Sequence, residues 1–261
     1  MTSKAEQTVG VIGGMGPKAT LDFYAKLIQR TQAETDQDHL HVIINSNAKV
    51  PNRQNALSGK GPSCAPELIQ AARALESAGA DFMVMVCNTA HAYEDHIRAE
   101  INVPFISIIR ENVIHCLNLV PNLRKVGILG ATGCLDNKLY QDQFDKAGVD
   151  CTILNPDDQN RFMKLMYQIK ANNLDFSVGM EMEQLAQKLV NDGAEIILAA
   201  CTEIPLVLQK EFVSVPLVNS TDVLVESVIN HARPVDKLES KRYVYSMHKE
   251  GFLPRSQVVS T

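Results

Sequence analysis

The 261-residue sequence has no tryptophan, no cysteines in a CxxC spacing and no apolar run of about 18 residues, the length that a membrane span requires. Its first residues, MTSKAEQT, lack the hydrophobic core of a signal peptide. The formal net charge is −5, which argues against nucleic acid or an anionic membrane as a partner. We therefore expect a cytoplasmic protein in which an anionic ligand must meet a local cation.

The sequence does contain two similar segments that end on a cysteine. GADFMVMVCNTAH covers residues 79–91 and GAEIILAACTEIP covers residues 193–205, and in each the cysteine comes eight positions after the first glycine. A chain of this length does not need disulfides to be stable, so the cysteines are predicted to be reduced thiols, with a single-residue role open to one or two of them. There are six of them: Cys64, Cys87, Cys116, Cys134, Cys151 and Cys201.

Two further pairs of segments repeat in the same order and at nearly the same spacing. VGVIGGMG (9–16) is similar to VGILGATG (126–133), and VPFISI (103–108) is similar to VPLVNS (215–220). A repeat of this kind indicates an internal duplication. We expect a first lobe of residues 1–112 plus about 220–235, a second lobe of residues 113–219, and a polar tail of residues 236–261 that is either disordered or covers a partner subunit.

Short apolar strands alternate with amphipathic helices in both halves, which predicts an α/β fold of two pseudo-symmetric lobes, each a parallel sheet flanked by helices. One helix is expected after Pro17, with Leu21, Tyr24, Ala25, Leu27 and Ile28 on its apolar face. PFISII (104–109) is interpreted as a strand, and residues 221–231 as a last helix that packs back on the first lobe.

The two repeated cysteines are expected at the carboxyl ends of equivalent strands, where open parallel sheets bind their ligands. Cys87 and Cys201 would then face each other across the cleft between the lobes, each near a helix N-terminus that lowers its pKa. A single such cysteine is more often a core residue, but two at equivalent positions favour a functional pair. A zinc site would need about four ligands, and only His91 lies nearby in the sequence.

A thiol on each face of a carbon centre suits one reaction in particular. One thiolate removes a proton from one face while the opposite thiol delivers a proton to the other, which inverts a stereocentre without a cofactor. The site must also hold the carboxylate into which negative charge spreads.

GVIGGMGPKAT, CNTAH and CTEIPL resemble the aspartate/glutamate racemase family, and in particular its aspartate racemase branch, over residues 9–231. The resemblance implies two α/β lobes, a homodimer, no cofactor and no metal. It also implies that Cys201 handles the proton of the L-substrate and Cys87 that of the D-substrate. We therefore expect a PLP-independent racemase of an acidic amino acid, most directly aspartate. Glutamate or broad-specificity racemisation, maleate isomerisation or malonate decarboxylation, and an amino-acid sensor without turnover remain as alternatives.

The remaining candidates for substrate binding come from the residues around these motifs, and each has a structural alternative. Met15 could equally be a core residue, Arg53 and Lys170 surface charges, and Lys164 could replace Lys170. Asn88, Thr89 and Thr202 could cap helices. Relatives carry a threonine pair where this chain has Thr132 and Cys134, so that contact is open. The predicted binding residues are Met15, Arg53, Asn88, Thr89, Thr132, Lys170, Thr202 and Glu203.

Overall fold

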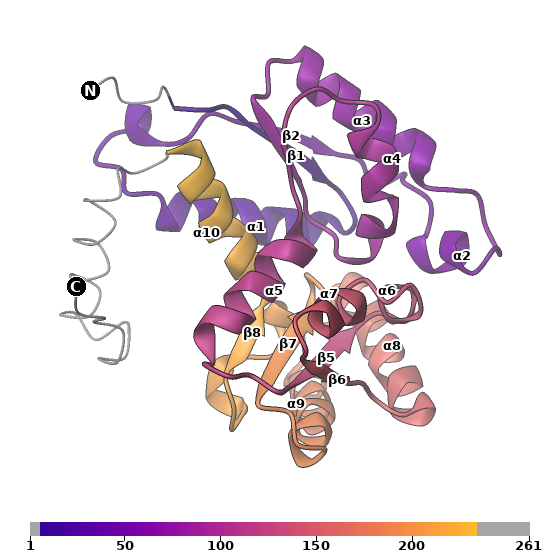
Figure 1. Cartoon of the computed structure of the whole chain (residues 1–261). Coiled ribbons are helices and arrows are strands. Elements are labelled where there is room, and N and C mark those ends of the chain that lie inside the picture. Colours follow the sequence, from indigo (N-terminus) through magenta and orange to yellow (C-terminus); the bar gives the residue numbers. More distant parts are fainter. Residues whose placement is uncertain (1–5, 234–261) are drawn as a thin grey trace.

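The computed structural model describes residues 6–233 and contains two four-stranded sheets (Figure 1). All neighbouring strands are parallel. The first sheet has the order β2-β1-β3-β4 and the second the equivalent order β6-β5-β7-β8, which confirms the predicted pair of similar α/β lobes. The strands are β1 (Val9–Gly13), β2 (Val42–Ser46), β3 (Phe82–Met85), β4 (Phe105–Ile106), β5 (Lys125–Gly130), β6 (Asp150–Thr152), β7 (Ile196–Ala200) and β8 (Leu217–Asn219).

Helices cover both faces of each sheet, as parallel sheets require. In Figure 1, α3 and α4 lie on one side of the upper sheet, α1 and α10 lie on the other, and α5 runs between the lobes. The helices are α1 (Pro17–Arg30), α2 (Arg53–Leu57), α3 (Ala65–Ser77), α4 (Glu94–Arg98), α5 (Ile108–Leu119), α6 (Thr132–Asp136), α7 (Gln141–Lys146), α8 (Pro156–Lys170), α9 (Phe176–Asn191) and α10 (Ser220–Ala232), with short 3-10 turns η1 (Asp36–Asp38), η2 (Thr89–Tyr93), η3 (Ile204–Leu206) and η4 (Lys210–Phe212).

The two lobes share one central hydrophobic core. Side chains of both sheets belong to the same buried cluster, among them Val11 and Val84 from the first sheet and Ile128 and Leu198 from the second. Two further clusters lie on the outer faces, one under α3 and one under α8 and α9. Because close-packed interiors deform little, this shared core fixes the carboxyl ends of β3 and β7 relative to each other. The division into lobes at residues 112/113 and 219/220 itself stays a prediction.

The glycine that opens each repeated segment ends a helix. Gly79 follows α3 and Gly193 follows α9, and both have φ near +90°, a conformation that glycine adopts without steric cost. Each glycine thereby turns the chain into the strand that leads to a motif cysteine. The duplication is therefore visible in backbone geometry as well as in residue type.

The helix after Pro17 is confirmed, but of the five residues predicted on its apolar face only Leu27 is buried. α1 buries Ala19, Phe23 and Leu27, whereas Leu21 is 66% exposed and Ile28 is 43% exposed. Two apolar stripes run along this helix at the same helical period, so periodicity alone could not tell which one faces the sheet.

The strand predicted at 104–109 is shorter than expected. β4 ends at Ile106, and α5 begins at Ile108 after the extended residue Ser107. Short apolar runs are compatible with either a strand or a buried helix, and here the second half of the run forms the first turn of α5.

The last helix packs on the first lobe, as predicted, because α10 lies along α1 and α5. Lys26 and Arg30 of α1 form ion pairs with Asp222 at 2.9 and 3.2 Å. The predicted tail, residues 236–261, lies outside the described residues. Within residues 6–233, no helix is long and apolar enough to cross a membrane.

We expect Asp222→Asn to lower the free energy of unfolding by about 1 kcal/mol at neutral pH. Burial opposes ionisation of Asp222, but the hydrogen bond and charges of Lys26 and Arg30 outweigh it and lower the pKa of this carboxyl. The stabilisation is therefore present above the ordinary pKa of 3.8 and is lost as the pH falls through the lower folded value. Urea titrations at several pH values should show the difference from wild type shrinking in acid. An equal difference at all pH values would exclude the ion pairs as its source.

Candidate active site

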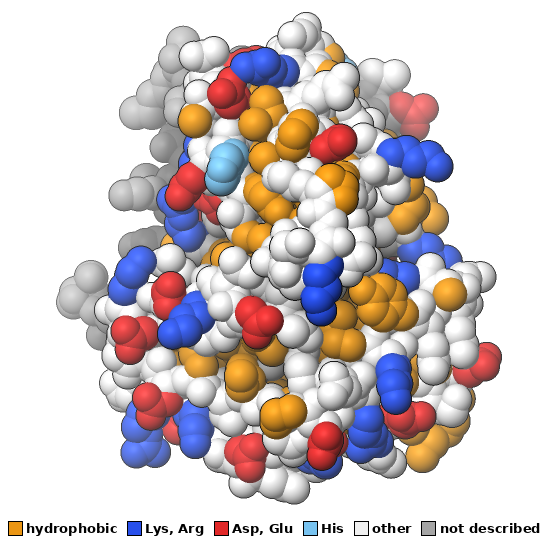
Figure 2. All heavy atoms as spheres, turned by 90° about the vertical axis from the view of Figure 1, so that its right-hand side faces the viewer, with side chains coloured by type: hydrophobic (Ala, Val, Ile, Leu, Met, Phe, Trp, Pro, Cys, Tyr) orange, Lys and Arg blue, Asp and Glu red, His pale blue; other side chains and the backbone are white. Residues whose placement is uncertain are grey.

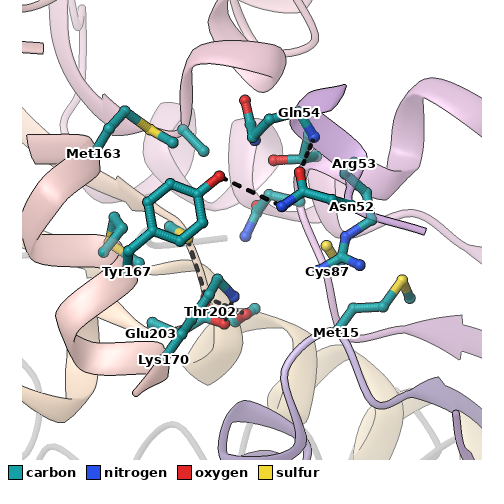
Figure 3. Close-up of a pocket in the computed structure, with 15 residues that line it drawn as sticks. Met15, Asn52, Arg53, Gln54, Cys87, Met163, Tyr167, Lys170, Thr202 and Glu203 are labelled. Carbon is teal, nitrogen blue, oxygen red and sulfur yellow. Dashed lines mark hydrogen bonds and ion pairs between the residues drawn. The ribbon is translucent and has the colours of Figure 1, made fainter. Parts of the chain in front are cut away.

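Cys87 and Cys201 line one pocket between the two lobes (Figure 3). Cys87 comes two residues after β3, and Cys201 directly follows β7. Both are buried, and both are unpaired thiols. The structure thus brings the two motif cysteines to the same cavity, one from each sheet.

The space between the lining residues amounts to about 510 Å³, a value that includes solvent at the open mouth of the pocket. Its lining comes about equally from the two lobes. The first lobe provides Met15, Asn52, Arg53, Gln54, Cys87, Asn88 and Thr89, and the second provides Ala131, Met163, Met166, Tyr167, Lys170, Cys201, Thr202 and Glu203.

Cys201 lies against a buried carboxylate. Its thiol donates a hydrogen bond to Glu203 Oε2 at 3.1 Å. Burial raises the pKa of the Cys201 thiol well above its ordinary value, and the charge of Glu203 raises it further, while Lys170 acts in the opposite direction. The expectation of a pKa lowered by a helix N-terminus is therefore wrong for Cys201, because burial and a neighbouring negative charge outweigh the short 3-10 turn that follows it.

The Glu203 carboxylate is bound by groups of both lobes. Its carboxylate accepts hydrogen bonds from the Thr202 hydroxyl at 3.2 Å and from the backbone N–H of Gly16 at 3.2 Å, and it forms an ion pair with Lys170. The backbone N–H of the glycine-rich turn before α1 thus binds a carboxylate of the protein itself. Lys170 faces the pocket with its charge already balanced by Glu203.

We expect Glu203→Gln to make Cys201 more acidic. The substitution removes the negative charge that raises the thiol pKa and leaves Lys170, which lowers it. The rate of Cys201 alkylation by iodoacetamide, followed by peptide mass spectrometry, should reach its half-maximum at a lower pH than in wild type. Glu195→Gln, at the opposite end of β7, is the matched control. An unchanged pH profile would mean that Glu203 does not control the Cys201 proton.

Arg53 is the first residue of α2 and lines the pocket. One guanidinium nitrogen, Nη1, donates to the backbone oxygens of Val50 at 3.2 Å and Pro51 at 2.9 Å. Figure 3 shows its side chain directed toward Met15 and Cys87. Within residues 6–233, its guanidinium forms no ion pair with a carboxylate, so its charge is available to a ligand.

His91 fixes the backbone of Cys87. Its Nδ1 lies 2.8 Å from the Cys87 oxygen, and its Nε2 accepts from the N–H of Ile108 at 3.3 Å, which assigns the proton to Nδ1. Burial lowers the pKa of His91, while the charge of Glu94 partly opposes that effect. The neutral imidazole therefore links the end of β3 to the start of α5.

Gln54 and Tyr167, which the sequence did not single out, take part in hydrogen bonds that join the lobes at the pocket. The side-chain amide of Asn52 donates to the Tyr167 hydroxyl at 3.4 Å, and Gln54 accepts a hydrogen bond from the backbone N–H of Gly133. Figure 3 shows Asn52 and Tyr167 pointing toward each other from opposite walls. The signal for Tyr167 was its place three residues before Lys170 on α8, because residues one helical turn apart share a helix face. Gln54 follows Arg53 directly on α2, and no such pattern points to it.

Some predicted residues lie elsewhere. Thr132 does not line the pocket; its hydroxyl accepts from Gln159 at 3.2 Å and its N–H is directed at Met163 Sδ. Lys170 lines the pocket and Lys164 does not, and Cys134 is buried in the central core. Met15, Thr89 and Thr202 lie in the pocket wall as expected. No group of three or more potential metal ligands occurs within residues 6–233.

The face of the molecule that includes α2 and α8 carries side chains of both charges (Figure 2). Basic and acidic residues are interspersed there, without a continuous patch of one sign. An anionic ligand approaching this face would therefore depend on the cations of the pocket for its binding.

Comparisons with known proteins agree with this geometry. Residues 12–228 match the family model described as Asp/Glu/Hydantoin racemase. The chain is 27% identical to the broad specificity amino-acid racemase RacX of Bacillus subtilis over 85% of this chain and 96% of that protein. Among solved structures, aspartate racemase of Picrophilus torridus has a TM-score of 0.78 at 26% identity, covering 87% of this chain and 94% of the other.

An aspartate racemase homologue from Pyrococcus horikoshii has a TM-score of 0.71 at 26% identity, covering 87% of this chain and 99% of the other. The glycine-rich turn, both motif cysteines and the pocket between them all lie within the matched residues 12–228. The chain belongs to the Asp/Glu/hydantoin racemase family.

Proposed function

We propose that this protein racemises an acidic amino acid, most directly aspartate, without pyridoxal phosphate or a metal. Cys87 and Cys201 are the two acid–base groups, and Arg53 binds the side-chain carboxylate. The observation that carries this proposal is that the two repeated cysteines, each at the end of a strand in a different sheet, line a single pocket.

The charges of the pocket favour an acidic substrate. Its lining includes two cations, Arg53 and Lys170, and one carboxylate, Glu203, which leaves one positive charge in excess while both thiols are protonated. An acidic amino acid carries two carboxylates and one ammonium group, so its net charge of one negative unit complements the site. A carboxylate buried without a cation would be costly, and Arg53 is the lining cation whose charge is not already balanced by Glu203.

The resting hydrogen bonds suggest where the protons are. Cys201 is a thiol donating to Glu203, so it is ready to protonate Cα, while the thiolate of Cys87 removes the Cα proton of the D-substrate from the other face. The product is the L-enantiomer, Cys87 has gained a proton and Cys201 has lost one. In the L-to-D direction the same steps run backward, and Glu203 can accept the Cys201 proton that must leave before that direction begins.

Broad specificity is the second candidate, and a particular wall of the pocket favours it. Met15, Met163 and Met166 line the cavity together with Tyr167. Methionine side chains are flexible and polarizable, so they adapt to ligands of different shape. The similar protein RacX of Bacillus subtilis is itself described as a broad specificity amino-acid racemase.

The test is to incubate the reduced protein with L-aspartate and no added cofactor and to follow the circular dichroism of the amino acid. The signal should decay to zero, with one solvent deuterium incorporated at Cα in D₂O. A signal that persists until pyridoxal phosphate is added would refute the mechanism. Parallel incubations with glutamate, alanine and maleate separate acidic specificity, broad specificity and isomerisation. A sensor without turnover would be thermally stabilised by aspartate but would show no deuterium uptake.

A further inference from the structure

Asn88, the residue after Cys87, is part of a buried hydrogen-bond chain that crosses between the lobes. Its side-chain oxygen accepts from the hydroxyl of Tyr140, and its side-chain nitrogen donates to the hydroxyl of Ser220 at 3.0 Å. Tyr140 immediately precedes α7, and Ser220 is the first residue of α10, directly after β8. Both partners are fully buried.

This arrangement differs from the helix-capping role that was open for Asn88. An asparagine at the start of a helix usually caps it, but the Asn88 side chain makes no capping hydrogen bond to η2. Both the oxygen and the nitrogen of the amide have protein partners, so the protein orients this side chain before any ligand binds. Asn88 thus lines the pocket while its amide is held in place by buried side chains of the protein.

We propose that Tyr140 and Ser220 are positioning residues that, through Asn88, hold Cys87 in register with the second lobe and so with Cys201. The inference rests on the proposed function, because the relative position of the two thiols affects the rate only if both exchange protons with the same carbon. Neither partner touches the pocket, so both act through Asn88.

Because it is buried, this chain of hydrogen bonds has fixed donors and acceptors. Burial raises the pKa of Tyr140 well above its ordinary value, so its phenol remains a proton donor, which fixes the Asn88 oxygen as the acceptor and its nitrogen as the donor. Asn112 of α5 donates to the backbone oxygen of Ser220 at 3.2 Å and so anchors the far end. On the other side, His91 holds the backbone oxygen of Cys87. The Cys87 peptide is therefore fixed from both directions.

Tyr140→Phe is the test, since it keeps the buried ring and removes only the hydroxyl. A displacement of about 1 Å at a reacting group can cost about 10²-fold in rate. We expect kcat for L-aspartate to fall by about 10-fold or more, with KM changed by less than about twofold. Ser220→Ala should act in the same direction, and the double variant should lose less than the product of the two effects because both act through Asn88.

Ser227→Ala is the matched control, because it removes a hydrogen bond of 2.8 Å between α10 and Glu111 of α5 away from the pocket. Ser227→Ala should have a melting temperature similar to those of Tyr140→Phe and Ser220→Ala, but its kcat should equal that of the wild type. Losses of kcat in Tyr140→Phe and Ser220→Ala no larger than in the control would overturn the proposal.

A second readout does not depend on turnover. Iodoacetamide labelling of the substrate-free protein, resolved by peptide mass spectrometry, should change in rate at Cys87 by about threefold or more in Tyr140→Phe, and not at Cys151. If the wild-type protein fails to racemise aspartate, the proposed function fails while this measurement still decides the role of Tyr140. Equal labelling of Cys87 in wild type and in both variants would refute that role.

Discussion

Replacing either Cys87 or Cys201 with serine is expected to lower kcat for racemisation by about 10²–10⁴-fold, the usual cost of losing a general acid or base. Serine is nearly the same size as cysteine, but its hydroxyl has a much higher pKa and does not supply the base. Both directions of the reaction pass through both thiols, so each substitution should impair conversion of both enantiomers. The measurement is the decay of the circular dichroism of L- and D-aspartate.

The matched control is Cys151→Ser, at a half-buried thiol of β6 that does not line the pocket. It should leave the rate unchanged. Cys116 is less suitable, because it lies in the central core, where a serine hydroxyl would be buried. Full activity in either pocket variant would eliminate the two-thiol mechanism.

The two pocket variants should differ in isotope exchange. With Cys87 replaced, Cys201 can still remove and return the Cα proton of L-aspartate; with Cys201 replaced, Cys87 can do the same for D-aspartate. In D₂O, each variant should therefore incorporate deuterium into one enantiomer without inverting it. Exchange of the opposite enantiomer in each variant would reverse the assigned faces.

The sequence could predict the features that repeat. Gly79 and Gly193 open equivalent segments, so the two sheets and the strand-end positions of Cys87 and Cys201 followed from a comparison of the chain with itself. Regular alternation of apolar strands and helices then implied parallel sheets with ligands at their carboxyl ends. These inferences need only local patterns and the handedness of βαβ connections.

The sequence could not predict contacts made across the fold. Glu203 meets Gly16 and Lys170, and Asn88 meets Tyr140 and Ser220, because two lobes dock on a shared core. The raised pKa of Cys201 follows from such contacts and from burial, so a local argument from the following helix gave the wrong direction. The face of α1 was wrong for a related reason, since only tertiary packing selects between its two apolar stripes.

Arg53→Ala is expected to reduce kcat/KM for aspartate by about 30-fold to several thousand-fold, which corresponds to about 2–5 kcal/mol for loss of a desolvated charge pair. A guanidinium can hold a carboxylate through two parallel hydrogen bonds and so fix its orientation. Nη1 of Arg53 already donates to the oxygens of Val50 and Pro51, which orients the group and leaves its other nitrogens for the ligand. Lys170 contributes less, because Glu203 balances its charge.

Asparagine provides the comparison that decides the role of Arg53, because it has the shape of aspartate without the side-chain charge. The affinity for asparagine, measured as a substrate or as an inhibitor, should change little in Arg53→Ala, whereas that for aspartate should fall strongly. Lys49→Ala removes an exposed cation from the same loop outside the pocket and should leave both values unchanged. Equal losses for aspartate and asparagine would instead assign Arg53 to the α-carboxylate or to the 50–53 loop, and the acidic preference would then need another source.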